Sequence, residues 1–132
     1  MFIELKADMT VQDVKRAFHE AYPYLKLEFF MQKHASGEGT SLSQKVDDAT
    51  QLVDVRGAMK EGTVDVEPQQ TVMEMEQLFQ EKFNLPVQVF RKSKSIWLET
   101  TETDRFTLQQ QNELGKESTL GLTGMATGYY DE

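Results

Sequence analysis

The side chains that could carry out chemistry are few in this chain and lie far apart. It has two histidines, His19 and His34, and no cysteine, which rules out thiolate catalysis, disulfides and thiolate-bound metals. His19 follows Phe18 beside the apolar stripe of an expected helix, a position typical of a surface residue rather than a general base. His34 has no second histidine or carboxylate at the spacing of a metal site. We therefore expect no enzymatic activity, no catalytic residue, no metal and no cofactor.

Two polar segments offer an alternative function. The 33–41 loop contains S-G-E-G-T-S, whose glycines would let backbone N–H groups approach a phosphate, but Glu38 stands where a cation would help. The acidic 99–104 turn supplies carboxylate oxygens without the glycine turn of a calcium loop. The alternative is therefore a small-molecule or divalent-ion binding domain that uses this loop and this turn.

Composition and charge argue against several classes of partner. The chain has 132 residues and a net charge of -8, whereas nucleic-acid affinity depends on Lys and Arg that neutralise phosphates. It contains no apolar run of the roughly 20 residues needed to cross a bilayer. The opening F-I-E-L segment lacks the pattern of a signal peptide. We expect a cytoplasmic protein with no nucleic-acid and no membrane partner.

The elements that must position any site occur twice along the chain. Residues 2–6 predict a strand, Thr10 predicts a helix N-cap, and residues 25–32 predict a second strand after Pro23 ends the helix. The helix between them has one apolar stripe, made of Val11, Val14, Ala17, Phe18 and Tyr22. The first unit, about residues 1–32, is therefore a strand, a helix and a strand.

A second unit, about residues 62–92, follows the same order with a shift of 61. Thr71 is the corresponding N-cap, and Asn84 and Pro86 close the helix. All five stripe positions stay apolar, as Val72, Met75, Leu78, Phe79 and Phe83. Such a unit cannot bury its stripe alone, so two copies are expected to share one sheet.

These patterns favour an α+β fold, a two-layer α/β sandwich whose mixed sheet carries its helices on one face, in a ferredoxin-like or β-grasp-like topology. We expect one domain over residues 1–116 and a flexible C-terminal tail over 117–132. Further strands are expected at 51–56 and 95–100, and a short helix at 108–114.

Residues 50–123 resemble a ubiquitin-like β-grasp domain. The similar segments are an expected hairpin ending T-V-D-V-E-P, then Q-Q-T-V-M-E-M-E-Q-L-F-Q-E-K-F-N-L-P, then V-Q-V-F and T-L-Q-Q-Q-N-E-L-G-K-E-S-T-L-G-L. The insert around 93–106 is longer than the family pattern. The end G-Y-Y-D-E lacks the family's terminal Gly-Gly, so the resemblance does not imply conjugation to other proteins.

The strands after the second helix carry the surface that we expect to act. We expect Val89 and Leu98 to face the helices, so strand alternation turns Phe90 and Trp97 to the opposite face. Phe30 has the same outward parity in the first unit. Three exposed aromatic side chains would form an apolar patch for a partner, unless the third helix or the C-terminal segment covers them.

A basic cluster lies beside these aromatics in an otherwise acidic chain. It consists of Arg91, Lys92 and Lys94, although most such turns only keep a hairpin soluble. We expect the partner-binding residues to be Phe30, Phe90, Trp97, Arg91 and Lys92. The predicted function is a non-enzymatic protein-interaction module that binds a protein partner, or itself, through the outer face of the sheet.

Overall fold

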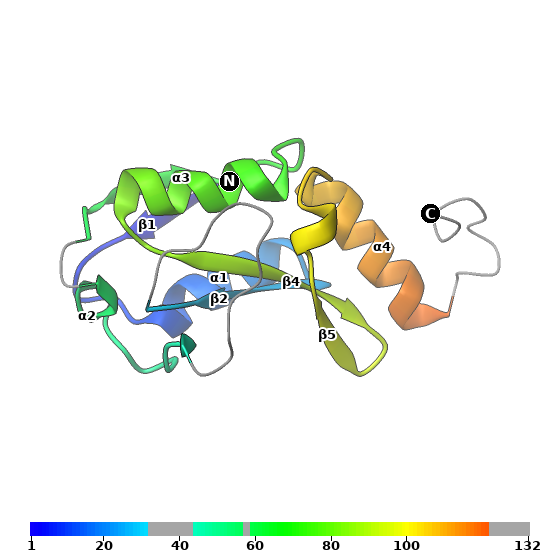
Figure 1. The fold of residues 1–132 in the computed structure, drawn as a ribbon, viewed down its shortest axis with the longest axis horizontal. Helices are drawn as coiled ribbons and strands as arrows, with labels where there is room; N and C mark the ends of the chain where they lie inside the picture. The colour runs from blue at the N-terminus through cyan, green and yellow to red at the C-terminus, as the bar shows by residue number, and fades with distance from the viewer. Residues whose placement is uncertain (32–43, 57–58, 122–132) are drawn as a thin grey trace.

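Helices alternate with short strands along the chain. The structure is a computed structural model that describes residues 1–31, 44–56 and 59–121 (Figure 1). Its elements are β1 (Phe2–Leu5), α1 (Val11–Ala21), β2 (Leu25–Phe29), α2 (Val53–Arg56), β3 (Gly62–Asp65), α3 (Val72–Phe83), β4 (Val87–Ser93), β5 (Ile96–Glu99), the 3-10 helix η2 (Thr101–Thr103) and α4 (Leu108–Leu120). The chain is an α+β protein, as the sequence predicts.

The strands form two sheets, and each sheet takes strands from both units. β1 pairs with β3, whereas β2, β4 and β5 form the second sheet in that order. Side chains from both sheets and from α1 and α3 belong to one hydrophobic core cluster. This arrangement fits a two-layer α/β sandwich. Every strand pair of the described residues is antiparallel, however, so the expected single mixed sheet is replaced by two antiparallel sheets.

Corresponding strands of the two units pair with each other at corresponding residues. Ile3 lies directly opposite Val64, and their numbers differ by 61. Leu27 lies opposite Val89, and their numbers differ by 62, because the second unit has one more residue between the start of its helix and its second strand. A twofold rotation relates the two members of an antiparallel strand pair. Each of these two strand pairs is therefore centred on an approximate local twofold axis that relates corresponding strands of the two units.

The repeat continues beyond the second strand of each unit, which the sequence analysis missed. A closing segment runs beside the start of each long helix, residues 48–52 in the first unit and 104–108 in the second. The Val11 N–H donates to a carbonyl of the first segment at 2.8 Å, and the Val72 N–H donates to the second at 3.0 Å. The segments read D-A-T-Q-L and D-R-F-T-L, so their shared Asp and Leu were a detectable signal.

Each long helix begins at a capping box. The hydroxyls of Thr10, Thr71 and Thr107 accept the backbone N–H three residues later, and the side chain at that position accepts the backbone N–H of the threonine. α3 ends at Asn84, which has a left-handed backbone with φ of 58°. The two predicted N-caps, at Thr10 and Thr71, are confirmed.

The segment 51–56 is not the strand that we expected. Gln51 forms an isolated bridge with Thr10, and the next residues form α2. β3 pairs with β1, the corresponding strand of the first unit, so this edge of β3 is not open to residues 51–56. The expected hairpin is therefore absent, and the resemblance of 50–123 to β-grasp domains stays a prediction without it.

α4 continues to Leu120, four residues past the domain boundary expected after residue 116. The hydroxyl oxygens of Ser93 and Ser118 lie 2.6 Å apart, so the last turns of α4 are bound to β4. A Cβ placed on Gly115 would lie 2.9 Å from the Tyr24 Cβ, which shows how closely α4 approaches the start of β2. α4 and α2 occupy opposite ends of the molecule in Figure 1. Residues 122–132 of the expected tail lie outside the described residues.

Candidate functional site

Two of the three aromatics expected on the outer sheet face are buried. Phe30 is 0% exposed and Phe90 is 7% exposed, which corrects the expectation of an open aromatic patch. The Phe30 N–H donates to Pro86, and the residue forms an isolated bridge with Lys45, so backbone 44–46 runs beside the end of β2. The side chain of Lys26 lies over the Phe90 ring, with Nζ 5.6 Å from its centre.

A buried carboxylate holds three lysines on this face. Glu28 lies opposite Gln88 in the β2–β4 pair, and its side chain is 3% exposed. Lys15 Nζ lies 2.8 Å from its Oε1, while Lys26 and Lys45 lie 3.2 Å and 3.1 Å from its Oε2. This lysine cluster is not apparent from the sequence, because α1, β2 and residue 45 meet only in the folded chain.

Charge balance within the lysine cluster keeps Glu28 ionised. Burial opposes ionisation of this carboxyl group, but hydrogen bonds from Lys15 and Lys45 hold its pKa below the ordinary value. Burial likewise lowers the pKa of Lys15, and its bonds to Asp48 and Glu28 outweigh that effect, so this pKa is raised. The Lys15 Nζ to Asp48 Oδ1 distance is 2.6 Å. These charges bind one another and have a structural role.

Trp97 is the predicted aromatic that stays partly open. Its ring centre lies 6.2 Å from that of His19 on α1, in an edge-to-face arrangement, and 5.0 Å from Lys26 Nζ. These side chains and Arg16 line a shallow groove of about 330 Å³. The His19 Nδ1 lies 2.8 Å from the Leu25 carbonyl oxygen, which fixes the ring at the edge of β2.

Arg91 and Lys92 lie on opposite faces of the sheet. Lys92 lies opposite Trp97, so both point to the outer face. Arg91 lies opposite Leu25 and points to the other face, where its Nη1 donates to Gln111 of α4 at 2.8 Å. Arg91 therefore fixes α4 to the sheet and does not join the surface around Trp97.

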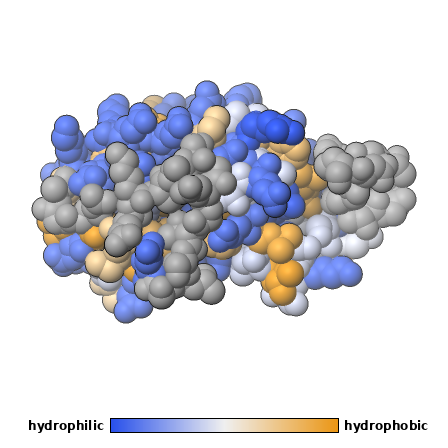
Figure 2. Space-filling model, viewed as in Figure 1, coloured by the Kyte–Doolittle hydropathy of each residue, from blue (hydrophilic) through white to orange (hydrophobic). Residues whose placement is uncertain are grey.

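β5 carries large apolar side chains at the surface. Ile96 is 56% exposed and Leu98 is 37% exposed, and Figure 2 shows hydrophobic atoms at the surface where β5 lies. Leu98 lies opposite Arg91 and so shares a sheet face with Val89, as the alternation predicts. Leu98 nevertheless stays partly exposed, because the core cluster contains no residue of β5.

The backbone of β5 is paired along one edge only. The Lys92 N–H donates to Tyr24 of the β2 side, so Lys92 and Trp97 form a pair without hydrogen bonds between them. The N–H and C=O of Trp97, and those of Glu99 two residues on, therefore point away from β4. No strand of residues 1–31, 44–56 or 59–121 pairs with this outer edge.

Glu76 on α3 is a second buried carboxyl group with a different role. Its Oε2 accepts the Val89 N–H at 2.9 Å, and the hydroxyl of Thr100 donates to the Val89 carbonyl at 2.9 Å. Burial raises the pKa of Glu76 to about 8, with a further contribution from Asp104. The last residue pair between β4 and β5 is Phe90 with Glu99. Beyond it, the side chains of Glu76 and Thr100 bind the β4 backbone in place of a strand. Glu76 therefore completes the hydrogen bonding of the sheet and is buried away from any substrate.

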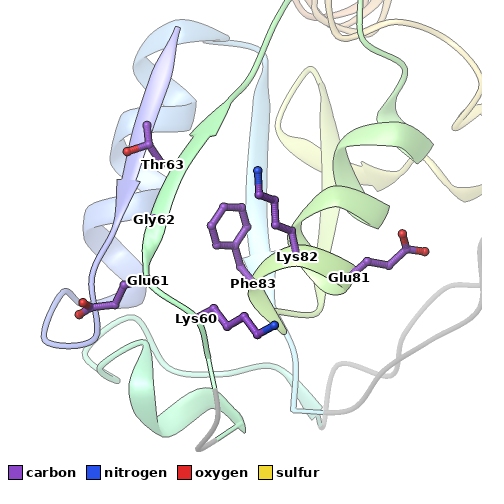
Figure 3. A pocket seen from close by; sticks show the side chains of 7 residues that line it. All are labelled: Lys60, Glu61, Gly62, Thr63, Glu81, Lys82 and Phe83. Carbon is purple, nitrogen blue, oxygen red and sulfur yellow. The ribbon is translucent and has the colours of Figure 1, made fainter.

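A hollow of about 540 Å³ lies between the start of β3 and the end of α3 (Figure 3). Its wall is the ring of Phe83, which points toward Gly62, and a Cβ on Gly62 would lie 2.9 Å from that ring. Its rim carries two lysines and two glutamates. Glu61 is already bound, because its Oε2 accepts the Ala7 N–H at 2.7 Å. The balanced rim gives no preference for a charged ligand.

The structure supplies little for the alternative ion site. The 33–41 loop and His34 lie outside the described residues. Within those described, which include the 99–104 turn, no group of three His, Asp or Glu side chains could hold a metal ion. None of the helices in the described segments combines the length and the apolar character needed to cross a membrane.

Comparison with known proteins identifies no relative. No family model, no curated protein and no solved structure matches the chain.

Proposed function

We propose that the chain is a non-enzymatic protein-interaction module that binds a protein strand along the outer edge of β5. The observation that carries the proposal is that one edge of this four-residue strand pairs with no strand of the described residues, and that Ile96 and Leu98 expose apolar side chains. An extended segment added to a sheet edge gains main-chain hydrogen bonds, while alternate side chains provide the apolar contacts.

The outer edge of β5 also lacks the features that usually protect an edge strand. It reads I-W-L-E, with no proline, no lysine and one terminal charge. β1 also exposes an apolar side chain, Phe2, but Glu4 and Lys6 follow it and their charged groups lie 3.7 Å apart. Charged side chains on an edge discourage pairing with another strand.

Photocrosslinking in the native cell tests this proposal for any protein partner. Leu98 is replaced by p-benzoylphenylalanine, and Phe2 is replaced in the same way in a matched control, because it is exposed on the other sheet. We expect a covalent adduct with a protein from position 98 and none from position 2. Absence of an adduct from position 98, or equal adducts from both positions, would contradict the proposal.

The groove beside Trp97 supports a second candidate function, binding of a small anionic ligand. Three cations, Lys15, Arg16 and Lys26, line it with one carboxylate, Asp48, beside an indole ring. Lys15 and Lys26 already bind Glu28, so Arg16 is the main cation for such a ligand. Trp97 is the only tryptophan of the chain, so its fluorescence reports on this groove alone. Titration with phosphate and with benzoate should change the emission if the groove binds anions, and a flat titration with both would remove this candidate.

A further inference from the structure

We infer that the protein strand bound along β5 is β5 of a second copy of this chain, paired antiparallel about a twofold axis at Leu98. This inference rests on the proposed function and adds the identity of the partner. It joins the two three-stranded sheets into one six-stranded sheet, in the order β2, β4, β5, β5, β4, β2.

The directions of the backbone groups restrict the register of this pair. The groups that point to the outer edge belong to Trp97 and Glu99. Placing Trp97 opposite Glu99 of the second copy lets both residues exchange their N–H and C=O bonds. By symmetry the same pair forms twice, so the centre of the register is Leu98.

This register brings the most exposed apolar side chains together. Leu98 lies opposite Leu98 of the second copy in a pair without hydrogen bonds, where side chains of antiparallel strands approach most closely. Both leucines are 37% exposed in the single chain and would lose water contact on pairing. Ile96, which is 56% exposed, flanks this contact on the same face.

Charge complementarity favours a second copy over an arbitrary strand. The β4–β5 turn carries the exposed Lys94, while the exposed Glu99 makes the other end of β5 acidic. Antiparallel pairing places the basic end of one strand along the acidic end of the other. In the Leu98-centred register, the turn that carries Lys94 lies next to the end of the second copy's β5, where Glu99 is, and this approach also occurs twice.

The expected association is reversible and of low affinity, because β5 has only four residues. Interfaces that bury less than about 1,200 Å² belong to the transient class. The experiment is therefore sedimentation equilibrium of the full chain from about 10 μM to about 1 mM. We expect the average mass to rise toward twice that of one chain.

A charge exchange tests the register. Lys94→Glu and Glu99→Lys each bring like charges together at both ends of the paired strands, so each should weaken association about fivefold. An equal mixture of these two variants restores both attractive pairs and should associate as the wild type does. Leu98→Lys should abolish association, whereas Phe2→Lys, with its exposed side chain on the other sheet, should not. Far-UV circular dichroism shows that each variant is folded.

The outcomes separate the two proposals. A chain that stays monomeric at about 1 mM overturns the self-pairing, and a crosslink from position 98 to a different protein would still support the interaction module. Association that Leu98→Lys does not reduce also overturns the self-pairing. Association that Leu98→Lys abolishes but that the charge variants and their mixture leave unchanged overturns the Leu98-centred register. Absence of any crosslink from position 98 overturns both proposals.

Discussion

At the scale of single residues, the structure contains two buried carboxyl groups whose pKa values are shifted in opposite directions. Glu28 stays ionised because three lysines surround it, whereas Glu76 meets one backbone N–H and has its pKa raised to about 8 by burial. The sequence shows neither difference, because both residues follow ordinary patterns for surface glutamates. Their environments depend on which distant lysines the fold brings near.

Replacement of Glu28 should destabilise the fold strongly. Glu28→Gln keeps the shape of the side chain and leaves the lysine cluster without its central anion, so the free energy of unfolding should fall by about 2–3 kcal/mol in urea denaturation. The pKa of Glu28 is lower in the folded chain, so its contribution is present above about pH 4.5 and is lost as the pH falls. Glu4→Gln is the control, because Glu4 is 68% exposed. Equal effects of the two changes would contradict a central role for Glu28.

Glu76 should give the opposite pH dependence. Its folded-state pKa of about 8 exceeds the ordinary value of 4.5, so the folded chain holds the extra proton and loses stability as the pH rises through this window. Glu76→Gln keeps an acceptor for the Val89 N–H and removes the titration. Relative to this variant, the wild type should lose on the order of 3 kcal/mol between about pH 5 and about pH 8.5. Urea denaturation across this pH range measures the difference, and parallel pH profiles would contradict a raised pKa.

At the scale of elements, local sequence signals are accurate where the element is determined locally. Thr10 and Thr71 start their helices, Asn84 ends one, and the apolar stripes face the core as periodicity predicts. The prediction fails at residues 51–56, because nothing local shows that β3 already has β1 as its partner. The alternation of side chains also does not predict the burial of Phe90 or the exposure of Leu98. It shows on which face of the sheet a side chain lies, and not what covers that face.

The close packing of α4 makes a prediction against helix propensity. Gly115→Ala would favour the helix by about 1 kcal/mol in isolation. Its Cβ would meet the Tyr24 Cβ at 2.9 Å and the Arg91 Cγ at 3.1 Å, so α4 must shift from the sheet. We expect a net loss of about 1–3 kcal/mol in thermal or urea denaturation. Lys116→Ala, exposed on the same helix, should be neutral, and a stabilised Gly115→Ala protein would show that α4 is loosely packed.

At the scale of the whole molecule, strands of the first half of the chain pair with strands of the second half. β1 and β2 do not pair with each other and take β3 and β4 as partners. The sequence predicts only that the two repeat units share a sheet, and it does not show which strands pair. The choice between one mixed sheet and two antiparallel sheets depends on contacts between residues that are 57 to 66 positions apart in the sequence.

Cutting the chain between residues 58 and 59 tests this interdependence. The fragment 1–58 should be unfolded alone, because it keeps α1 and loses the pairing strand of both β1 and β2. Mixing it with 59–132 should restore the far-UV circular dichroism of the intact protein. A folded spectrum for 1–58 alone would contradict the shared core.

The approximate twofold relation between corresponding strands of the two units also bears on how such a protein can diverge. If two separate identical chains formed this core, every substitution would appear twice and would have to suit both copies. In one joined chain, corresponding positions change independently. Glu28 corresponds to Phe90 by the shift of 62, and Lys15 corresponds to Glu76 by the shift of 61. One copy thus carries the lysine cluster, while the other carries Phe90 and the strand β5, so corresponding positions of the two units have different roles.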